Sequence, residues 1–129
     1  MAGSSKAFLD ANLFIDIVIS RSRSERVKYL ISLHQDVCIS TLTVANSYYV
    51  INRQDKITVK EMERYTAEFI VLDISAISLE KAYKIATDQD LEDAMQVAAA
   101  IIGGVDVFYT ADARLVKNYG HLLDIQLVS

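Results

Sequence analysis

Apolar runs and amphipathic stretches alternate along the chain. Short apolar runs, typical of buried strands, fall at 7–9, 36–39, 70–74 and 105–109, with an edge strand at 125–128. Helical spacing of apolar residues predicts helices over 13–19, 24–34, 41–53, 60–69, 78–87, 91–102 and 112–119. Strands that alternate with helices, without a tight hairpin signal, indicate a parallel sheet covered by helices on both faces.

Capping residues and apolar stripes refine the helices. Asn12 and Ser24 are good N-cap residues for the first two helices, and Gly103 and Gly104 end the helix over 91–102. We expect two helices to bury stripes of apolar side chains, namely Leu42, Ala45, Tyr49 and Val50 in one and Leu79, Ala82, Tyr83 and Ala86 in the other.

Length and charge limit the classes of protein that fit. The 129 residues predict one domain, with residues 1–5 as a loose tail. No apolar run is long enough for a membrane helix and no secretory segment opens the chain, so we expect a soluble, cytoplasmic protein. The net charge of −4 argues against a protein that coats nucleic acid, and the lone Cys38 is expected to be a buried thiol.

Three acidic residues occupy similar places relative to the predicted strands. Asp10 ends the first strand, Asp93 lies in the first turn of the helix over 91–102, and Asp112 follows the fourth strand. A parallel sheet brings such positions to one edge, where ligands bind. Converging carboxylates repel one another unless a cation neutralises them, and Mg²⁺ or Mn²⁺ suits carboxylate and water ligands.

Each acid also has a structural interpretation. Asp90 and Asp93 could form a capping box on their helix, and Asp112 could serve the dipole of the last helix with Thr110 as its cap. Asp10 could simply end a strand. These alternatives stay open for each acid taken singly, whereas three acids at one sheet edge favour a site.

The ordered motifs resemble those of the PIN domain, in particular its VapC-like members. They are Asp10-Ala11-Asn12 with Asp16, the block from Asp90 to Gln96, and Thr110-Ala111-Asp112, and together they span about residues 6–128. The resemblance implies a three-layer α/β sandwich with a central, mainly parallel five-stranded sheet, and a metal-dependent endoribonuclease that uses Mg²⁺ or Mn²⁺.

The resemblance also implies roles for individual residues. Asp10, Asp93 and Asp112 match the acidic, catalytic metal ligands, and Asn12 and Thr110 match supporting polar positions. Asp16 and Asp90 are further supporting candidates.

Asn46 departs from the family pattern, which commonly has a glutamate in this helix. An amide oxygen can coordinate a metal or hold a water, but it brings no negative charge, so the site should bind Mg²⁺ more weakly. Asn46 could equally be a core amide without a catalytic use. The runner-up function is therefore a PIN-fold module that binds RNA or protein and cuts weakly or not at all.

Substrate and partners follow from the same resemblance. Arg21, Arg23, Arg26 and Arg114 are candidates for binding RNA phosphates, although solvated surface charge is the alternative for the cluster after the first helix. VapC-like proteins are typically toxins that a small antitoxin holds in check, and they commonly form homodimers.

Overall fold

The computed structural model describes residues 5–129. Of the predicted tail, residues 1–4 lie outside the described residues, whereas the carbonyl of Ser5 accepts backbone hydrogen bonds from Gln35 and Asp36. The strands are β1 (Lys6–Leu9), β2 (Asp36–Ser40), β3 (Ile70–Leu72), β4 (Val107–Thr110) and β5 (Ile125–Leu127). The helices are α1 (Ala11–Val18), α2 (Ser24–Ser32), α3 (Thr41–Asp55), α4 (Val59–Thr66), α5 (Ala76–Ile85), α6 (Leu91–Ile102) and α7 (Ala113–Tyr119).

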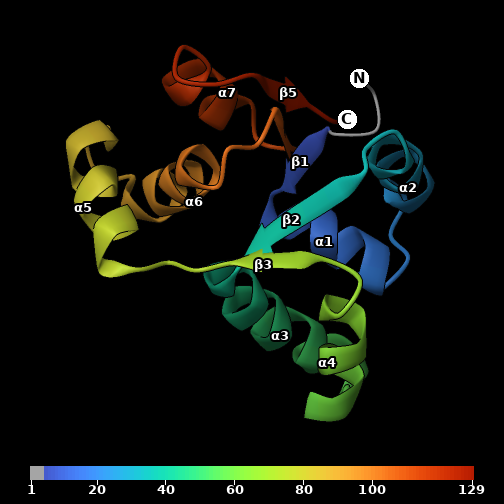
Figure 1. The fold of residues 1–129 in the computed structure, drawn as a ribbon. Helices are drawn as coiled ribbons and strands as arrows, with labels where there is room; N and C mark the ends of the chain where they lie inside the picture. The colour runs from blue at the N-terminus through green and yellow to red at the C-terminus, as the bar shows by residue number, and fades with distance from the viewer. Residues whose placement is uncertain (1–4) are drawn as a thin grey trace.

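The strands form one sheet in the order β3-β2-β1-β4-β5, and every pairing in it is parallel (Figure 1). β1 lies at the centre, where Phe8 is in register with Cys38 on β2 and Phe108 on β4. The predicted α/β class with a five-stranded parallel sheet is therefore confirmed. The parallel arrangement brings the carboxyl ends of β1, β2 and β4 to one edge.

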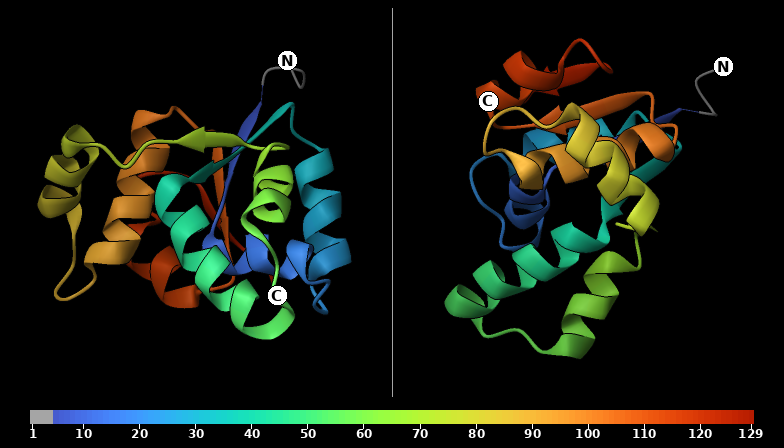
Figure 2. Two further views of the ribbon diagram at one scale, coloured as in Figure 1. Left: turned by 90° about the horizontal axis from the view of Figure 1, so that it is seen from below. Right: turned by 90° about the vertical axis from the view of Figure 1, so that its left-hand side faces the viewer.

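Side chains alternate between the two faces of the sheet and build two hydrophobic cores. On one face, Leu9 and Ile39 pack under α1 to α4. On the other face, Phe8 and Phe108 stack with their ring centroids 4.7 Å apart and pack under α5, α6 and α7. The resulting helix–sheet–helix layers are visible in Figure 2.

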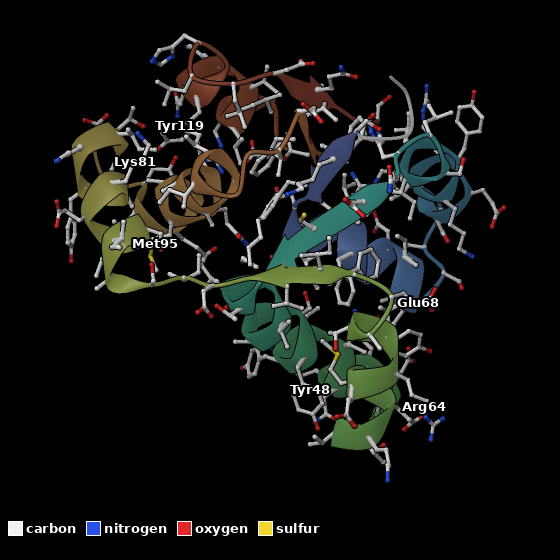
Figure 3. All side chains as sticks on the ribbon, in the orientation of Figure 1. Tyr48, Arg64, Glu68, Lys81, Met95 and Tyr119 are labelled. Atoms are coloured by element: carbon white, nitrogen blue, oxygen red, sulfur yellow. The ribbon has the colours of Figure 1, made fainter. Side chains whose placement is uncertain are left out.

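The helices pair within each layer. Met95 lies on the side of α6 that faces α5, and Tyr48 lies on α3 beside α4 (Figure 3). The Tyr48 hydroxyl donates a hydrogen bond of 3.3 Å to the carbonyl of Ile57, in the loop that joins α3 to α4. Cys38 is a buried free thiol, as expected. Among the described residues, no helix combines the length and the apolar character needed to span a bilayer.

Two predicted caps were wrong. Asp10, not Asn12, is the N-cap of α1, because its carboxylate accepts the amide of Ala11 and the helix begins two residues earlier than predicted. Ser24 is the first residue of α2 rather than its cap, and Arg23 occupies the N-cap position without a side-chain hydrogen bond.

The predicted apolar stripes were partly wrong. α3 buries Thr43, Ser47 and Ile51 against the sheet, whereas Tyr49 is 65% exposed. On α5, Ala82 is buried as predicted but Tyr83 is exposed. Thr43 can face inward because Ser40 and Gln96 of α6 supply hydrogen-bond partners for its hydroxyl, whereas the buried Ser47 hydroxyl has no such partner among the described residues. Two residues of the predicted stripe, Tyr49 and Val50, instead line a cavity.

Candidate active site

A cavity of about 570 Å³ opens at the carboxyl edge of the sheet. Asp10 reaches it from the end of β1, Asp93 from the first turn of α6, and Asp112 from the segment after β4. The structure thus brings together the three acids that lie far apart in the sequence. Other predicted site residues that line the same cavity are Asn12, Asn46, Asp90 and Arg114.

Asp10 is fixed by hydrogen bonds to both of its carboxylate oxygens. Its Oδ1 accepts from the amide of Ala11 at 2.8 Å, and its Oδ2 accepts from the Thr110 hydroxyl at 2.7 Å. Burial raises the pKa of Asp10, and the charges of Asp112 and Glu92 add to the rise, against the lowering effect of these two hydrogen bonds. The carboxylate is therefore rigidly held in surroundings that favour a nearby cation.

Thr110 connects two of the acids. Its side chain is fully buried, donates to Asp10 and accepts a hydrogen bond of 3.0 Å from the amide of Asp112. Thr110 is therefore not the cap of the last helix. The cap is Asp112 itself, whose Oδ1 accepts from the amide of Arg114 at 2.9 Å.

Asp112 differs electrostatically from the other two acids because it has a cationic partner. The Arg114 guanidinium lies 3.3 Å from its Oδ2. Partial burial would raise the pKa of Asp112, but the hydrogen bonds and the charge of Arg114 outweigh it, so the pKa is lowered. Asp112 is thus an ionised carboxylate at the rim of the cavity.

Asp93 is half-buried beside other acids. Burial, together with repulsion from Asp90, Asp10 and Asp112, raises its pKa from 3.8 to about 7. The capping box predicted for this helix is not formed, since Asp90 stands at the N-cap position of α6 without a side-chain hydrogen bond to the helix. The side chains of Asp90 and Asp93 are therefore not engaged in helix capping.

Asn46 contacts α6 at the wall of the cavity. Its Nδ2 donates a hydrogen bond of 3.2 Å to Oε2 of Glu92, which also lines the cavity. One helical turn further along α6, Gln96 is almost fully buried, and its Nε2 donates to the Thr43 hydroxyl at 2.9 Å. Asn46 thus belongs to the contact between α3 and α6 at the cavity wall.

Several predicted residues lie apart from the cavity. Asp16 is buried, and its Oδ2 accepts a hydrogen bond of 2.7 Å from Nε of Arg23. Nη1 of Arg21 lies 3.8 Å from Oδ1 of the same carboxylate. Arg26 is exposed on α2. None of these four residues lines the cavity, so the structure gives Asp16 a structural partner in each of the two arginines.

The donor set fits a hard divalent cation. The cavity offers carboxylate oxygens and amide oxygens, and two of its acids have raised pKa values that a positive charge would relieve. Within residues 5–129, no three His, Cys, Asp or Glu side chains lie close enough together to hold a metal ion as they stand. Mg²⁺ commonly takes only one or two carboxylates and keeps several waters, so an open arrangement of this kind is compatible with it.

Comparison with protein families identifies the family of this chain. The family model of the PIN domain matches residues 7–121, which includes every residue of the cavity discussed above. The chain belongs to the PIN domain family. A comparison with curated proteins finds no match.

Solved structures share the PIN fold of this chain at low sequence identity. A toxin–antitoxin complex from Klebsiella pneumoniae has a TM-score of 0.74 and 16% identity, over 95% of this chain and 98% of that one. VapC20 of Mycobacterium tuberculosis, described as a toxin that cleaves the sarcin–ricin loop, has a TM-score of 0.69 and 16% identity. The match covers 86% of this chain and 93% of VapC20. DNA-bound VapBC from Salmonella typhimurium has a TM-score of 0.69 and 18% identity, over 97% of this chain and 99% of that one.

Two residues of this PIN domain site were missed by sequence reasoning. Glu92 stands beside Asp93 within the recognised motif, and its proximity to Asn46 depends on the packing of α3 against α6. Gln96 carries a signal that could have been used, because it is a polar residue between the apolar positions of α6. A buried amide at such a position needs a partner, which here is provided by Thr43 and Ser40.

Proposed function

We propose that this PIN domain is a metal-dependent endoribonuclease that hydrolyses RNA phosphodiester bonds, and that it acts in the cytoplasm as the toxin of a toxin–antitoxin pair. The observation that carries the proposal is the convergence of Asp10, Asp93 and Asp112 on one cavity at the carboxyl edge of the sheet. Membership of the PIN family supports the same activity.

The carboxylates would hold Mg²⁺ or Mn²⁺. When bound, the ion would supply the Lewis acid that polarises the phosphodiester and makes a water nucleophilic. Asp10 is held by Ala11 and Thr110, so its oxygens are positioned before any ligand arrives. Burial and neighbouring acids raise the pKa of Asp93 in the metal-free site, and a bound cation would favour its ionised, ligating form.

Arg114 is the candidate cation best placed to meet RNA. It lines the cavity, and its exposed guanidinium lies beside Asp112 at the rim. Arg21 and Arg23 already pair with Asp16, and Arg26 is an exposed surface charge. None of the three lines the cavity, so we propose that they contact RNA away from the scissile bond.

The fold neighbours support the proposed partners. One is described as a toxin–antitoxin complex, and another is a VapBC complex bound to DNA. By analogy, we propose that a small antitoxin protein covers this chain. The resemblance to VapC-like proteins is the basis on which we also propose a homodimer.

The proposed activity is tested by cleavage of a mixed single-stranded RNA pool in Mg²⁺, Mn²⁺ or EDTA. We expect cleavage that requires metal and that falls in the Asp10→Asn/Asp93→Asn variant by more than the roughly 10- to 100-fold typical of a lost outer-shell partner. The matched control is Asp55→Asn/Asp73→Asn, which removes two exposed carboxylates outside the cavity and should cut normally.

Cleavage that persists in EDTA would contradict the carboxylate-site mechanism. A wild-type protein that binds RNA but leaves it intact in both metals would favour the second candidate, a PIN-fold binding module. The neutral Asn46 at the cavity wall is the observation that keeps this second candidate in view.

A further inference from the structure

Glu92 is an acid of the cavity that the proposed mechanism has not used. It belongs to the first turn of α6, one residue before Asp93, and lines the cavity together with Asp10 and Asp112. Its side chain is exposed, and within residues 5–129 no cation pairs with it, in contrast to Asp112 and its Arg114. Its negative charge therefore faces the cavity without a cationic partner.

Two hydrogen bonds cross between α3 and α6 beside the cavity, and one of them holds the Glu92 carboxylate. Thr43 on α3 accepts from Gln96 on α6 at 2.9 Å, and Asn46 on α3 donates to Glu92 on α6 at 3.2 Å. Residues 43 and 46 are three apart on their helix, and residues 92 and 96 are four apart on theirs, so each pair lies on one helical face. The buried Thr43–Gln96 contact thus sets the register that brings Asn46 against Glu92.

Asparagine at position 46 is well suited to this contact. Its amide nitrogen donates to Glu92, which leaves its neutral carbonyl oxygen to coordinate a cation or to accept a hydrogen bond from a water. A glutamate at the same position would place a second negative charge beside Glu92, and the two carboxylates would repel each other. In this pair Glu92 therefore carries the negative charge, and Asn46 holds the Glu92 carboxylate through a hydrogen bond.

We infer that Glu92 supplies a fourth carboxylate to the metal site and that Asn46 is the residue that positions it. This inference rests on the proposed function, since it concerns the cation that this function requires. A neutral residue at position 46 is then compatible with a metal site, because the carboxylate that the family commonly has on α3 is supplied here by Glu92 on α6.

The test is the affinity for Mn²⁺ in the absence of RNA, measured by isothermal titration calorimetry. Glu92→Gln keeps an acceptor for Asn46 but removes the charge, and we expect it to weaken Mn²⁺ binding by about 10-fold or more. The matched control is Glu80→Gln, which removes the same charge from an exposed position on α5 and should bind Mn²⁺ as the wild type does.

Two further variants separate charge from position. Asn46→Ala removes the amide that donates to Glu92 and should weaken Mn²⁺ binding. The urea concentration at the midpoint of its unfolding should equal that of Glu80→Gln. Asn46→Glu/Glu92→Gln moves the carboxylate across the same contact and should recover most of the affinity that Glu92→Gln loses.

Equal Mn²⁺ affinity in Glu92→Gln and Glu80→Gln would overturn the inference, as would a double variant that recovers nothing. Neither result depends on RNA cleavage. If Asp10→Asn abolishes Mn²⁺ binding and cleavage while Glu92→Gln alters neither, the nuclease assignment stands and only the role of Glu92 fails. If Glu92→Gln weakens Mn²⁺ binding in a protein that does not cut RNA, the inferred site stands without the nuclease activity.

Discussion

Asp93 shows at the level of one residue how a binding site can oppose folding. Its carboxylate is half-buried among Asp90, Asp10 and Asp112, and its pKa is raised from 3.8 to about 7. A group whose pKa is higher in the folded than in the unfolded state binds more protons when folded. Stability of the metal-free protein should therefore fall as pH rises through the interval between these two values.

We predict that, in EDTA, the melting temperature falls as pH increases from about 4 to about 7 because the unfolded chain ionises Asp93 more readily than the folded one. Asp93→Asn should flatten this slope and raise the melting temperature at neutral pH. Thermal unfolding at a series of pH values measures both effects. A slope that is unchanged in Asp93→Asn would show that other groups control it.

Individual residues also mark how far sequence reasoning could reach. Asp10, Asp93 and Asp112 were identifiable because each follows a strand or opens a helix, and parallel topology then requires them to share an edge. The interaction of Asp16 with Arg21 and Arg23 was not identifiable, since it depends on how the chain turns after α1. Glu92 was missed for the same reason, because its partner Asn46 is 46 residues away.

Among the helices, α6 was the easiest to predict and α3 the hardest. The apolar positions of α6 repeat through the whole helix, and its observed bounds, Leu91–Ile102, are those predicted. α3 carries polar residues on its buried face and Tyr49 on its exposed face. Hydrophobicity alone cannot assign such a helix, because a buried hydroxyl such as that of Thr43 is stabilised by a partner on another element.

The contact between α3 and α6 leads to a prediction at the element scale. Gln96→Leu removes two buried side-chain hydrogen bonds, one with the Ser40 hydroxyl and one with the Thr43 hydroxyl. Such a bond contributes about 0.5–1.5 kcal/mol, so the two together contribute about 1–3 kcal/mol. We expect the free energy of unfolding, measured in urea, to fall by about that amount. Met95→Leu, on the same helix, conserves volume and should cost less than about 1.5 kcal/mol. Equal losses in the two variants would contradict the role assigned to the network.

At the scale of the whole molecule, the acidic cavity links metal binding to stability. A cation that binds only the folded state stabilises it, by about 2.7 kcal/mol at a concentration 100-fold above the dissociation constant. For a domain of this size we expect Mn²⁺ to raise the melting temperature by roughly ten degrees. Differential scanning fluorimetry with Mn²⁺ or EDTA measures the rise, which should vanish in Asp10→Asn. A rise of the same size in that variant would place the stabilising ion elsewhere.

The order of the strands has a consequence for synthesis of the protein. β1 is made early but has β4 as its neighbour in the sheet, so Asp10 meets Thr110 and Asp112 only after some 100 further residues have been translated. A chain still on the ribosome therefore has no assembled cavity until β4 has inserted beside β1. We propose that this protein cleaves RNA. Its topology means that no assembled active site is present beside the translating ribosome while β1 to β3 are being made.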